Sequence, residues 1–405
     1  MKNIFIIDEH ISSKQNGFGT YLKMFLSIFK NTEHNITVLS ANDDTDELVF
    51  NEGEGYGTFR LPIFANGNFF LNGELAIALI KRYIYDNYNN VFFVCHSPCS
   101  KLLCTLKVHF PKSKLVFVIH DQGWTAPLFG DRHKLEKLLT HNYISLFRDI
   151  NYKRIKSYCN EEKKIYKYAD KVICLSESTY FILKDIYKVE ESKICLIPNG
   201  YQMTDDYKCT NRGAIREELG VSNKETLFLF VGRIVPAKGI IELLDAFEKL
   251  YQTHKDLRLV VAGQVFNHDE LAKHNRASYS RILYTGLINK EELNKWYLIA
   301  DVGVIPTYTE QCSYTALEMM AARLPVITTD GNGIKDMFVP NESALVVPAK
   351  QDTLSEDLAK VMEQIIHMNE EQKKKMTQKA YNTLQTKYSL DKMAKDYQKF
   401  VAELC

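Results

Sequence analysis

Residues 304–333 read VIPTYTEQCSYTALEMMAARLPVITTDGNG, and the order of apolar and polar residues in this stretch decides the fold class. The pattern predicts a strand, a loop, a helix, a second strand and a glycine turn. Two acids lie on either side of the loop-to-helix junction, with Glu310 in the loop and Glu318 about one turn inside the helix. Both can face a ligand at the helix N-terminus, where unpaired backbone N–H groups favour a phosphate. A phosphate-bearing ligand with several hydroxyls would satisfy both features.

The alternation of strand and helix patterns extends from this stretch through most of the chain. Short apolar runs are separated by amphipathic segments in which apolar residues recur every three to four positions, as in residues 240–251. This order predicts an α/β fold, in which mostly parallel sheets carry helices on both faces. The expected strands include Lys2–Asp8, Ile36–Ser40, Phe59–Phe64, Val91–His96, Leu115–His120, Val172–Leu175, Ile194–Ile197, Thr226–Val231, Leu257–Ala262, Ile282–Thr285, Val302–Pro306 and Ala344–Val347.

A polar stretch around residues 201–223 separates two such α/β halves, and we expect the inter-domain linker there. The predicted domains are therefore residues 1–205 and residues 206–385. The last segment, 386–405, is helical by pattern. Its aromatic residues Tyr397 and Phe400 are expected to pack back toward the first domain. A chain of 405 residues is long enough for two domains with a sizeable core each.

The composition is that of an ordinary globular protein, with 45% apolar and 25% charged residues. A net charge of +1 gives no sign of nucleic-acid binding. The chain shows neither a signal-peptide pattern nor an apolar run of transmembrane length, so we expect a cytoplasmic protein. Several of its nine cysteines lie inside apolar strand patterns, which is typical of reduced thiols. His96, Cys99 and Cys104 lack a second matched pair of ligands, and we predict no metal site.

A second loop with chemical character is GRIVPAKG, residues 232–239, which follows a buried strand and opens a helix. Its two cations, Arg233 and Lys238, would lie above a helix N-terminus. Arg offers planar bidentate donors and Lys a compact charge, so the pair can clamp a pyrophosphate without a metal. Two ordinary surface cations would give the same local sequence. The presence of Glu310 and Glu318 in the same half of the chain favours the clamp.

In parallel sheets, ligands bind beyond the carboxyl ends of the strands. His120 ends a strongly apolar run, KLVFVIHD, and suits a histidine near a reaction centre as well as one hydrogen-bonded at a domain surface. His96 follows another strand in the same way. The glycines Gly17 and Gly19 lie between the first strand and the first helix, where they would serve either a ligand loop or a turn that needs a positive φ.

Residues 146–171 are rich in basic and aromatic side chains, LFRDINYKRIKSYCNEEKKIYKYADK. A solvated helix face is one interpretation of this pattern. The other is a face that contacts an anionic acceptor or the anionic inner surface of a membrane.

With these motifs in view, the chain resembles the family 4 (group 1) retaining glycosyltransferases over nearly its whole length. The resemblance implies the GT-B fold, two Rossmann-like domains that face each other across a cleft. It rests on these segments: VGRIVPAKGI (231–240), EQCSYTALE (310–318), MAARLPVITTDGNG (320–333), VICLSES (172–178), IPNG (197–200) and GFG (17–19).

The resemblance also implies roles for individual residues. The implied catalytic residues are His120 and Glu310. The residues implied to bind the donor diphosphate are Arg233, Lys238, Gly17, Gly19, Ser313 and Tyr314. Those implied to bind the donor sugar are Glu310, Gln311, Cys312 and Ser313. Glu318 is implied to bind the ribose, and the base is implied to lie near Gly263, Leu287 and Ile288.

The sequence departs from the family pattern at two positions after Glu310. The family usually has glycine directly after the first acid and again two residues later, whereas this chain has Gln311 and Ser313. If the backbone there needs a positive φ or a very close approach of the sugar, these side chains would restrict it.

The implied activity is transfer of a sugar from a nucleoside-diphosphate sugar, most commonly a UDP-sugar in this family, to an acceptor hydroxyl with retained anomeric configuration. No carboxylate is placed as a covalent nucleophile, which favours front-face attack. The leaving diphosphate could accept the proton, and domain closure would exclude water. No metal cofactor is implied. The acceptor could be a free glycan, a lipid-linked glycan or a peptide. Two alternatives remain: a nucleotide-sugar epimerase on the same fold, and a catalytically silent partner protein.

Overall fold

The structure is a computed structural model. It describes residues 1–9, 17–43, 45, 49–53, 55–62, 73–140, 151–203, 211–264 and 277–404. Contacts divide the chain into two compact units, one formed by Met1–Gly200 with Leu390–Cys405 and the other by Tyr201–Ser389. The sequence boundaries at 205/206 and 385/386 therefore lie a few residues away from the observed crossings.

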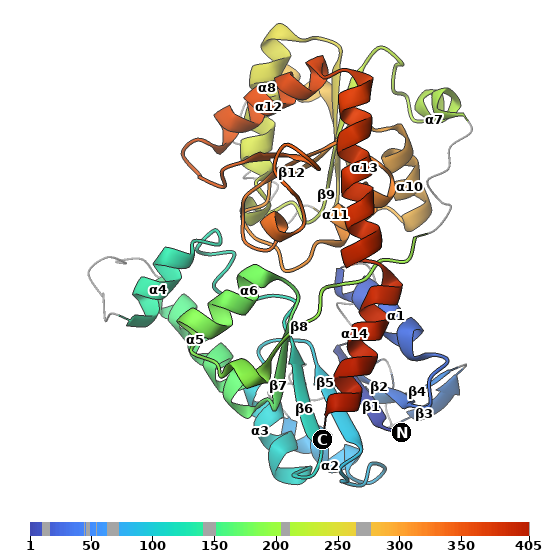
Figure 1. The fold of residues 1–405 in the computed structure, drawn as a ribbon, viewed down its shortest axis with the longest axis vertical. Coiled ribbons are helices and arrows are strands. Elements are labelled where there is room, and N and C mark those ends of the chain that lie inside the picture. Colours follow the sequence, from blue (N-terminus) through green and yellow to red (C-terminus); the bar gives the residue numbers. More distant parts are fainter. Residues whose placement is uncertain are drawn as a thin grey trace. The chain divides into compact units, whose positions relative to one another are not determined.

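The first unit contains an eight-stranded sheet in the order β3-β4-β2-β1-β5-β6-β7-β8 (Figure 1). Every neighbouring pair is parallel except β3 and β4, which pair antiparallel. The strands are β1 (Asn3–Glu9), β2 (Asn35–Asp43), β3 (Val49–Gly53), β4 (Tyr56–Pro62), β5 (Asn90–Val94), β6 (Lys114–Val118), β7 (Lys171–Cys174) and β8 (Ile194–Leu196). The helices are α1 (Gly17–Phe29), α2 (Gly73–Ile80), α3 (Ser100–His109), α4 (Arg132–Thr140), α5 (Asn151–Tyr168), α6 (Glu177–Phe181) and α14 (Leu390–Glu403), with a π turn at Ile182–Ile186 and a 3₁₀ turn at Glu191–Lys193.

Successive side chains of each strand point to opposite faces of the sheet, and in β5 and β6 both of these faces are buried. Phe92 of β5 belongs to the apolar cluster that also contains Leu102 of α3 and Ile155 of α5. Phe93, the next residue, lies 5.1 Å from the ring of Phe25 on α1, centroid to centroid. The continuous apolar runs predicted as strands are thus explained by burial on two sides.

The C-terminal helix α14 belongs to the first unit and lies beside α1 (Figure 1). Tyr397 is fully buried, and its hydroxyl shares a hydrogen bond of 2.8 Å with the hydroxyl of Tyr21. Phe400 is also buried and contacts the ring of Phe93. The aromatic residues that the sequence expected to dock therefore do so within this unit.

The second unit contains a six-stranded, wholly parallel sheet in the order β11-β10-β9-β12-β13-β14. Its strands are β9 (Thr226–Val231), β10 (Leu257–Ala262), β11 (Ile282–Gly286), β12 (Val302–Ile305), β13 (Val326–Thr329) and β14 (Leu345–Val347). The helices are α7 (Arg212–Glu218), α8 (Ile240–Thr253), α10 (Lys290–Ile299), α11 (Tyr314–Ala321), α12 (Leu354–His367) and α13 (Glu370–Lys387), with 3₁₀ turns at Pro236–Lys238, Ala277–Arg281 and Ile334–Asp336. Two parallel-sheet α/β units are the fold class that the sequence predicts.

Part of the expected linker is folded. Residues 212–218 form α7, and Arg216 is only 2% exposed. Its guanidinium donates to the backbone oxygen of Ile299 at 3.1 Å, and Arg212 donates to Asp301 at 2.7 Å. These arginines bind the end of α10, so a stretch that is polar in sequence still has a tertiary partner. Residues 204–210 of that linker lie outside the described part of the chain.

Candidate active site

Two loops of the second unit meet at the carboxyl ends of β9 and β12, which are neighbours in the sheet. Gly239 ends the first loop with a φ of 69°, and a Cβ there would lie 1.9 Å from the carbonyl oxygen of Pro306. The N–H of Tyr308 donates to the oxygen of Ala237 at 3.1 Å. Only glycine allows this contact, which fixes the cation-bearing loop against the acid-bearing loop.

This loop packing brings Lys238 to Glu310, although the two are 72 positions apart in sequence. Their Nζ and Oε1 atoms are 2.5 Å apart, and each side chain is 18% exposed. Arg233 is exposed, and its guanidinium has no polar contact with any residue in the described ranges. The predicted diphosphate lysine and the predicted sugar acid therefore bind each other here.

The glycine turn after β13 supports the acid-bearing loop from the other side. Gly333 has a φ of 77°, and a Cβ there would lie 2.0 Å from the carbonyl oxygen of Glu310. The N–H of Glu310 donates to the oxygen of Asn332 at 2.8 Å. The late glycines of the opening stretch are thus required by a backbone contact that positions Glu310.

The start of α11 has ordinary backbone geometry. Ser313 is the N-cap, with a φ of −72°, and its side chain accepts from the N–H of Ala316. Neither Ser313 nor Gln311 is among the non-glycine residues with a positive φ. Replacing the family's glycines therefore costs no backbone strain at these positions. The side chains of Gln311, Cys312, Ser313 and Tyr314 are all buried.

Glu318 lies on α11 and is 9% exposed. Its two carboxylate oxygens accept from Lys290 at 2.5 Å and from the hydroxyl of Tyr297 at 2.7 Å. Neither partner was predicted from the sequence. The available signal was position, because Lys290 begins the helix that follows the predicted base-binding residues Leu287 and Ile288.

The residues predicted near the base follow β10 and β11, which are neighbouring strands. Gly263 has a φ of 150°, and a Cβ there would lie 1.9 Å from the oxygen of Gly232. Its N–H donates to the oxygen of Gly286 at 3.0 Å. Leu287 is exposed and Ile288 is half-buried. Four consecutive strand ends of this sheet therefore carry predicted site residues: β11 and β10 for the base, β9 for the cations and β12 for Glu310.

In the first unit, His120 lies at the end of β6 beside aromatic residues of α1. Its ring centroid is 4.2 Å from that of Tyr21 and 5.3 Å from that of Phe18. Gly17 and Gly19, which flank Phe18, open α1. Burial, with a smaller contribution from His96, lowers the pKa of His120 to about 3. The imidazole is therefore neutral at physiological pH and can exchange hydrogen bonds without carrying charge.

Glu162 on α5 is a buried acid that the sequence analysis did not single out. Its Oε1 accepts from the N–H of Gly123 at 2.7 Å, and its Oε2 accepts from the hydroxyl of Tyr187. A Cβ on Gly123 would lie 2.6 Å from Cγ of Tyr158, which is also on α5. Burial raises the pKa of Glu162 to about 7. α5 thus holds the loop that follows His120.

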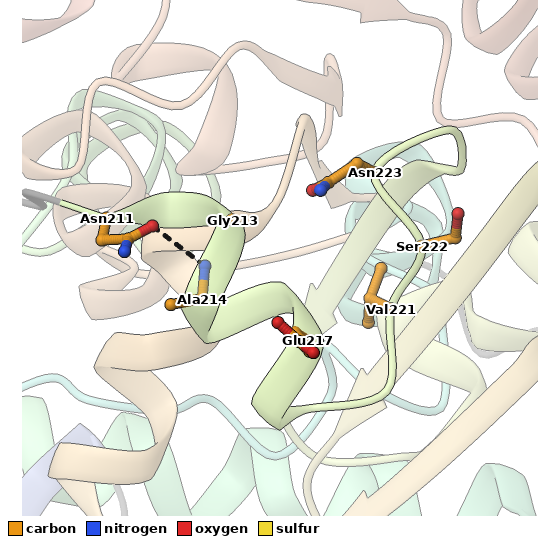
Figure 2. A pocket seen from close by; sticks show the side chains of 7 residues that line it. All are labelled: Asn211, Gly213, Ala214, Glu217, Val221, Ser222 and Asn223. Atoms are coloured by element: carbon orange, nitrogen blue, oxygen red, sulfur yellow. Dashed lines mark hydrogen bonds between the residues drawn. The ribbon is translucent and has the colours of Figure 1, made fainter.

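Two other features lie apart from the predicted residues. His254, Glu363 and His367 are a group of described residues whose ligand atoms all lie within 4.8 Å of one another. Figure 2 shows a hollow beside α7, where Oδ1 of Asn211 accepts from the N–H of Ala214 at 3.0 Å. The hollow is lined by Asn211, Gly213, Ala214, Glu217, Val221, Ser222 and Asn223. None of the predicted site residues lines it.

The basic segment predicted over residues 146–171 is described from residue 151 onward. There α5 exposes Lys153, Arg154, Lys163, Lys164 and Lys167. None of the helices in the described part of the chain combines the length and the apolar character that crossing a bilayer requires.

Comparison with protein families and known proteins gives consistent matches. The family described as Glycosyltransferase Family 4 matches residues 15–204, and the family described as Glycosyl transferases group 1 matches residues 211–383. Lipopolysaccharide 1,2-N-acetylglucosaminetransferase of Salmonella typhimurium is 24% identical over 359 residues, which are 80% of this chain and 88% of the relative. The putative teichuronic acid biosynthesis glycosyltransferase TuaC of Bacillus subtilis is 30% identical over 45% of this chain and 43% of its own length.

Solved structures share the fold over the whole chain. Sucrose-phosphate synthase from Thermosynechococcus elongatus superimposes with a TM-score of 0.77 at 18% identity, covering 100% of this chain and 99% of the other. HepE of Anabaena, solved in complex with UDP and glucose, gives a TM-score of 0.70 at 15% identity, covering 100% of both chains. These neighbours identify the GT-B fold.

Proposed function

The chain belongs to the group 1 glycosyltransferases of family 4, and from this membership we propose that it is a retaining, hexosyltransferase-type enzyme. It moves a sugar from a nucleoside-diphosphate sugar to an acceptor hydroxyl in glycan or glycoconjugate biosynthesis. Two relatives, a lipopolysaccharide 1,2-N-acetylglucosaminetransferase and a putative teichuronic acid biosynthesis glycosyltransferase, support this setting.

The observation that carries the proposal is the ion pair between Lys238 and Glu310 at the meeting point of two strand-end loops. A bound donor brings a diphosphate, which attracts Lys238, and sugar hydroxyls, which donate to Glu310. Both charged groups of the pair therefore gain a partner from the same ligand. Arg233, exposed on the same loop, adds bidentate donors to the diphosphate.

The most suitable donor is a UDP-sugar. Support comes from HepE, which was solved with UDP and glucose and has the same fold. In this proposal Glu318 binds the ribose, and the base lies by Gly263, Leu287 and Ile288. The backbone amides around Ser313 and Tyr314, at the start of α11, receive phosphate and sugar oxygens.

Charge on the leaving diphosphate is offset by Arg233 and Lys238, so the reaction requires no metal. The diphosphate itself accepts the proton of the attacking hydroxyl. Activity in the presence of excess EDTA should equal activity without it. Loss of activity in EDTA that Mg²⁺ or Mn²⁺ restores would contradict a metal-free site.

We assign the acceptor side to the first unit. A neutral His120 can exchange a hydrogen bond with a sugar hydroxyl. The exposed cations of α5 suit an anionic acceptor or an anionic lipid surface.

For the lipid, the matched test compares K163E/K164E with K374E/K375E on α13 in co-sedimentation with phosphatidylglycerol vesicles. Only the first pair should reduce binding, and equal binding of both would exclude α5 as the contact.

The decisive experiment is incubation with a panel of UDP-, ADP- and GDP-sugars, with and without glycan acceptors. Product formation only in the presence of an acceptor, with the anomeric configuration of the donor retained by NMR, is the expected result. Conversion of a donor without acceptor would instead indicate an epimerase. Absence of nucleotide binding and of turnover across the panel would indicate a silent partner protein.

A further inference from the structure

Glu318, the residue assigned to the ribose, is already bound by two donors of the same unit. We propose that Lys290 is a positioning residue of the donor site. Together with Tyr297 it orients the Glu318 carboxylate. Its positive charge also offsets the negative charge of Glu318, which would otherwise repel the diphosphate of an incoming donor. This inference rests on the proposed function, because it concerns the same donor site.

The position of Lys290 is fixed by the start of α10. Asn289 caps this helix in a capping box with Glu292, so the backbone of Lys290 is held at the first helical position. Its Nζ lies 2.5 Å from Oε1 of Glu318. The same ammonium lies 5.7 Å from the ring centroid of Tyr297 and 6.0 Å from that of Tyr201. One carboxylate and two aromatic faces therefore hold the charge in place.

The need for this charge follows from burial. The Glu318 side chain is 11% exposed, so water screens its charge poorly. An unpaired carboxylate in that position would repel the diphosphate of a donor bound to the same helix N-terminus. The positive charge of Lys290 removes this repulsion. Glu318 can still bind the ribose, because each carboxylate oxygen has two lone pairs and can accept from ribose hydroxyls as well.

The test is titration calorimetry with UDP on wild type, Lys290→Ala and Lys290→Arg. Losing a charge-assisted contact should weaken UDP binding in Lys290→Ala by about tenfold or more, and Lys290→Arg should restore most of it. Uridine, followed by saturation-transfer NMR, should lose clearly less affinity than UDP in Lys290→Ala, because it carries no diphosphate charge and depends only on the orientation of Glu318 toward the ribose. A merely structural role for Lys290 would weaken uridine and UDP alike.

The matched control is Lys295→Ala. Lys295 lies on the same helix and forms an ion pair of the same length, 2.5 Å, with Glu218. The Lys295→Ala variant should bind UDP with the affinity of wild type. Lys290→Ala binding UDP as wild type does would overturn the role of Lys290 and leave the proposed function standing. A wild-type protein that binds none of UDP, ADP and GDP would overturn both.

A separate cluster on the second unit has the composition of a transition-metal site. We infer that His254, Glu363 and His367 bind a divalent metal of the zinc class and join α8 to α12. Glu363 and His367 are four positions apart on one face of α12, and His254 is the C-cap of α8. Nε2 of His254 lies 3.6 Å from Oε1 of Glu363.

These separations suit zinc. Ligand atoms of a tetrahedral Zn²⁺ site lie ~3.4 Å apart, given bonds of about 2.0–2.1 Å. The three atoms here lie within 4.8 Å of one another, and Glu363 and His367 are exposed, so small side-chain rotations bring them into range. Two imidazoles and one carboxylate are ligands that zinc accepts, with a fourth position open to water.

The test is calorimetric titration of ZnCl2 into reduced, EDTA-treated and dialysed protein, together with His254→Ala, His367→Ala and His133→Ala. His133 is an exposed histidine of α4, outside the cluster. Wild type and His133→Ala should bind zinc, whereas His254→Ala and His367→Ala should not. Zinc should raise the melting temperature only of the two proteins that bind it. Zinc binding that is equal in all four proteins, or no binding in wild type, would overturn this site.

Discussion

At the residue scale, the donor side of the protein is organised by two acid–lysine pairs, Glu310 with Lys238 and Glu318 with Lys290. Each acid lies on or beside α11, and each lysine comes from a different strand-end loop or helix start. The spacing of the acids could be read from the sequence. The spacing does not show which lysine each acid binds, because the pairing depends on which strands are neighbours in the sheet.

Removing either cation of the GRIVPAKG loop should weaken nucleotide binding. Arg233→Ala and Lys238→Ala should each reduce UDP affinity by about ten- to a hundredfold, because each loses a charge-assisted contact worth about 1.5–3 kcal/mol. Calorimetry measures this. Lys238→Ala should also lower the melting temperature, since Glu310 loses its partner, whereas Arg233→Ala should not. Unchanged UDP affinity in both variants would exclude the clamp.

The roles of the two acids should separate kinetically. Glu318→Ala removes the ribose contact and should mainly raise KM for the donor. Glu310→Ala acts at the sugar and should mainly lower kcat. Steady-state kinetics with the donor found in the panel gives both constants. If Glu318→Ala mainly lowered kcat and Glu310→Ala mainly raised KM, the two assignments would have to be exchanged.

The glycine that joins the two loops should be intolerant of a side chain. Gly239 and Gly220 have nearly equal φ angles, 69° and 68°, but a Cβ would contact Pro306 only at Gly239 and nothing within 4 Å at Gly220. Gly220→Ala should cost about 1–2 kcal/mol for the left-handed backbone alone. Gly239→Ala should cost clearly more and weaken UDP binding, as measured by urea unfolding and calorimetry. Equal costs would show that the close contact is not required.

At the scale of elements, α5 holds the loop after β6 that carries His120. The N–H of Gly123 is bound by Glu162, 39 positions away, and Tyr158 packs on the same glycine. Because Glu162 is a buried acid with a raised pKa, this contact between helix and loop depends on pH.

Stability of the protein should therefore fall as pH rises through neutrality. The pKa of Glu162 is raised from 4.5 to about 7, so the folded protein holds a proton that the unfolded chain releases above pH 4.5. This contribution, about 3 kcal/mol at most, is complete below pH 4.5 and lost as pH rises through 7. Glu162→Gln cannot titrate. The unfolding free energy of wild type relative to Glu162→Gln should decrease from pH 5 to pH 8, and a constant difference would contradict the raised pKa.

At the scale of the whole molecule, the chain returns to its first unit after completing the second. α14 covers one face of the first sheet, where Tyr397 packs against Phe25 with ring centroids 5.2 Å apart. The last helix is thus part of the core of the unit that begins the chain.

A pair of neighbouring substitutions on α14 tests this docking. Tyr397→Ala removes a fully buried side chain and should cost about 3–5 kcal/mol. Gln398→Ala changes the next, exposed residue and should stay within about 0.5 kcal/mol of wild type. Calorimetric unfolding compares the two. Equal melting temperatures would show that α14 does not stabilise the first unit.

The sequence by itself determined the α/β class, the two halves and most elements of the second unit, where β9 and β10 have the predicted bounds. It also determined that Glu318 lies inside a helix, about one turn from its N-terminus. These features follow from local periodicity and turn chemistry, which neighbouring residues encode. The hairpin strand β3 escaped detection because its segment VFNEG has only two apolar residues, and Phe50 is exposed.

Only the tertiary structure decided which distant groups meet. Three such contacts join separate elements: Lys238 binds Glu310, Lys290 and Tyr297 donate to Glu318, and Glu162 accepts from Gly123. Such contacts depend on strand order and on close backbone approaches at glycines. A local pattern specifies an element and its buried face, but not the neighbour against which that face packs.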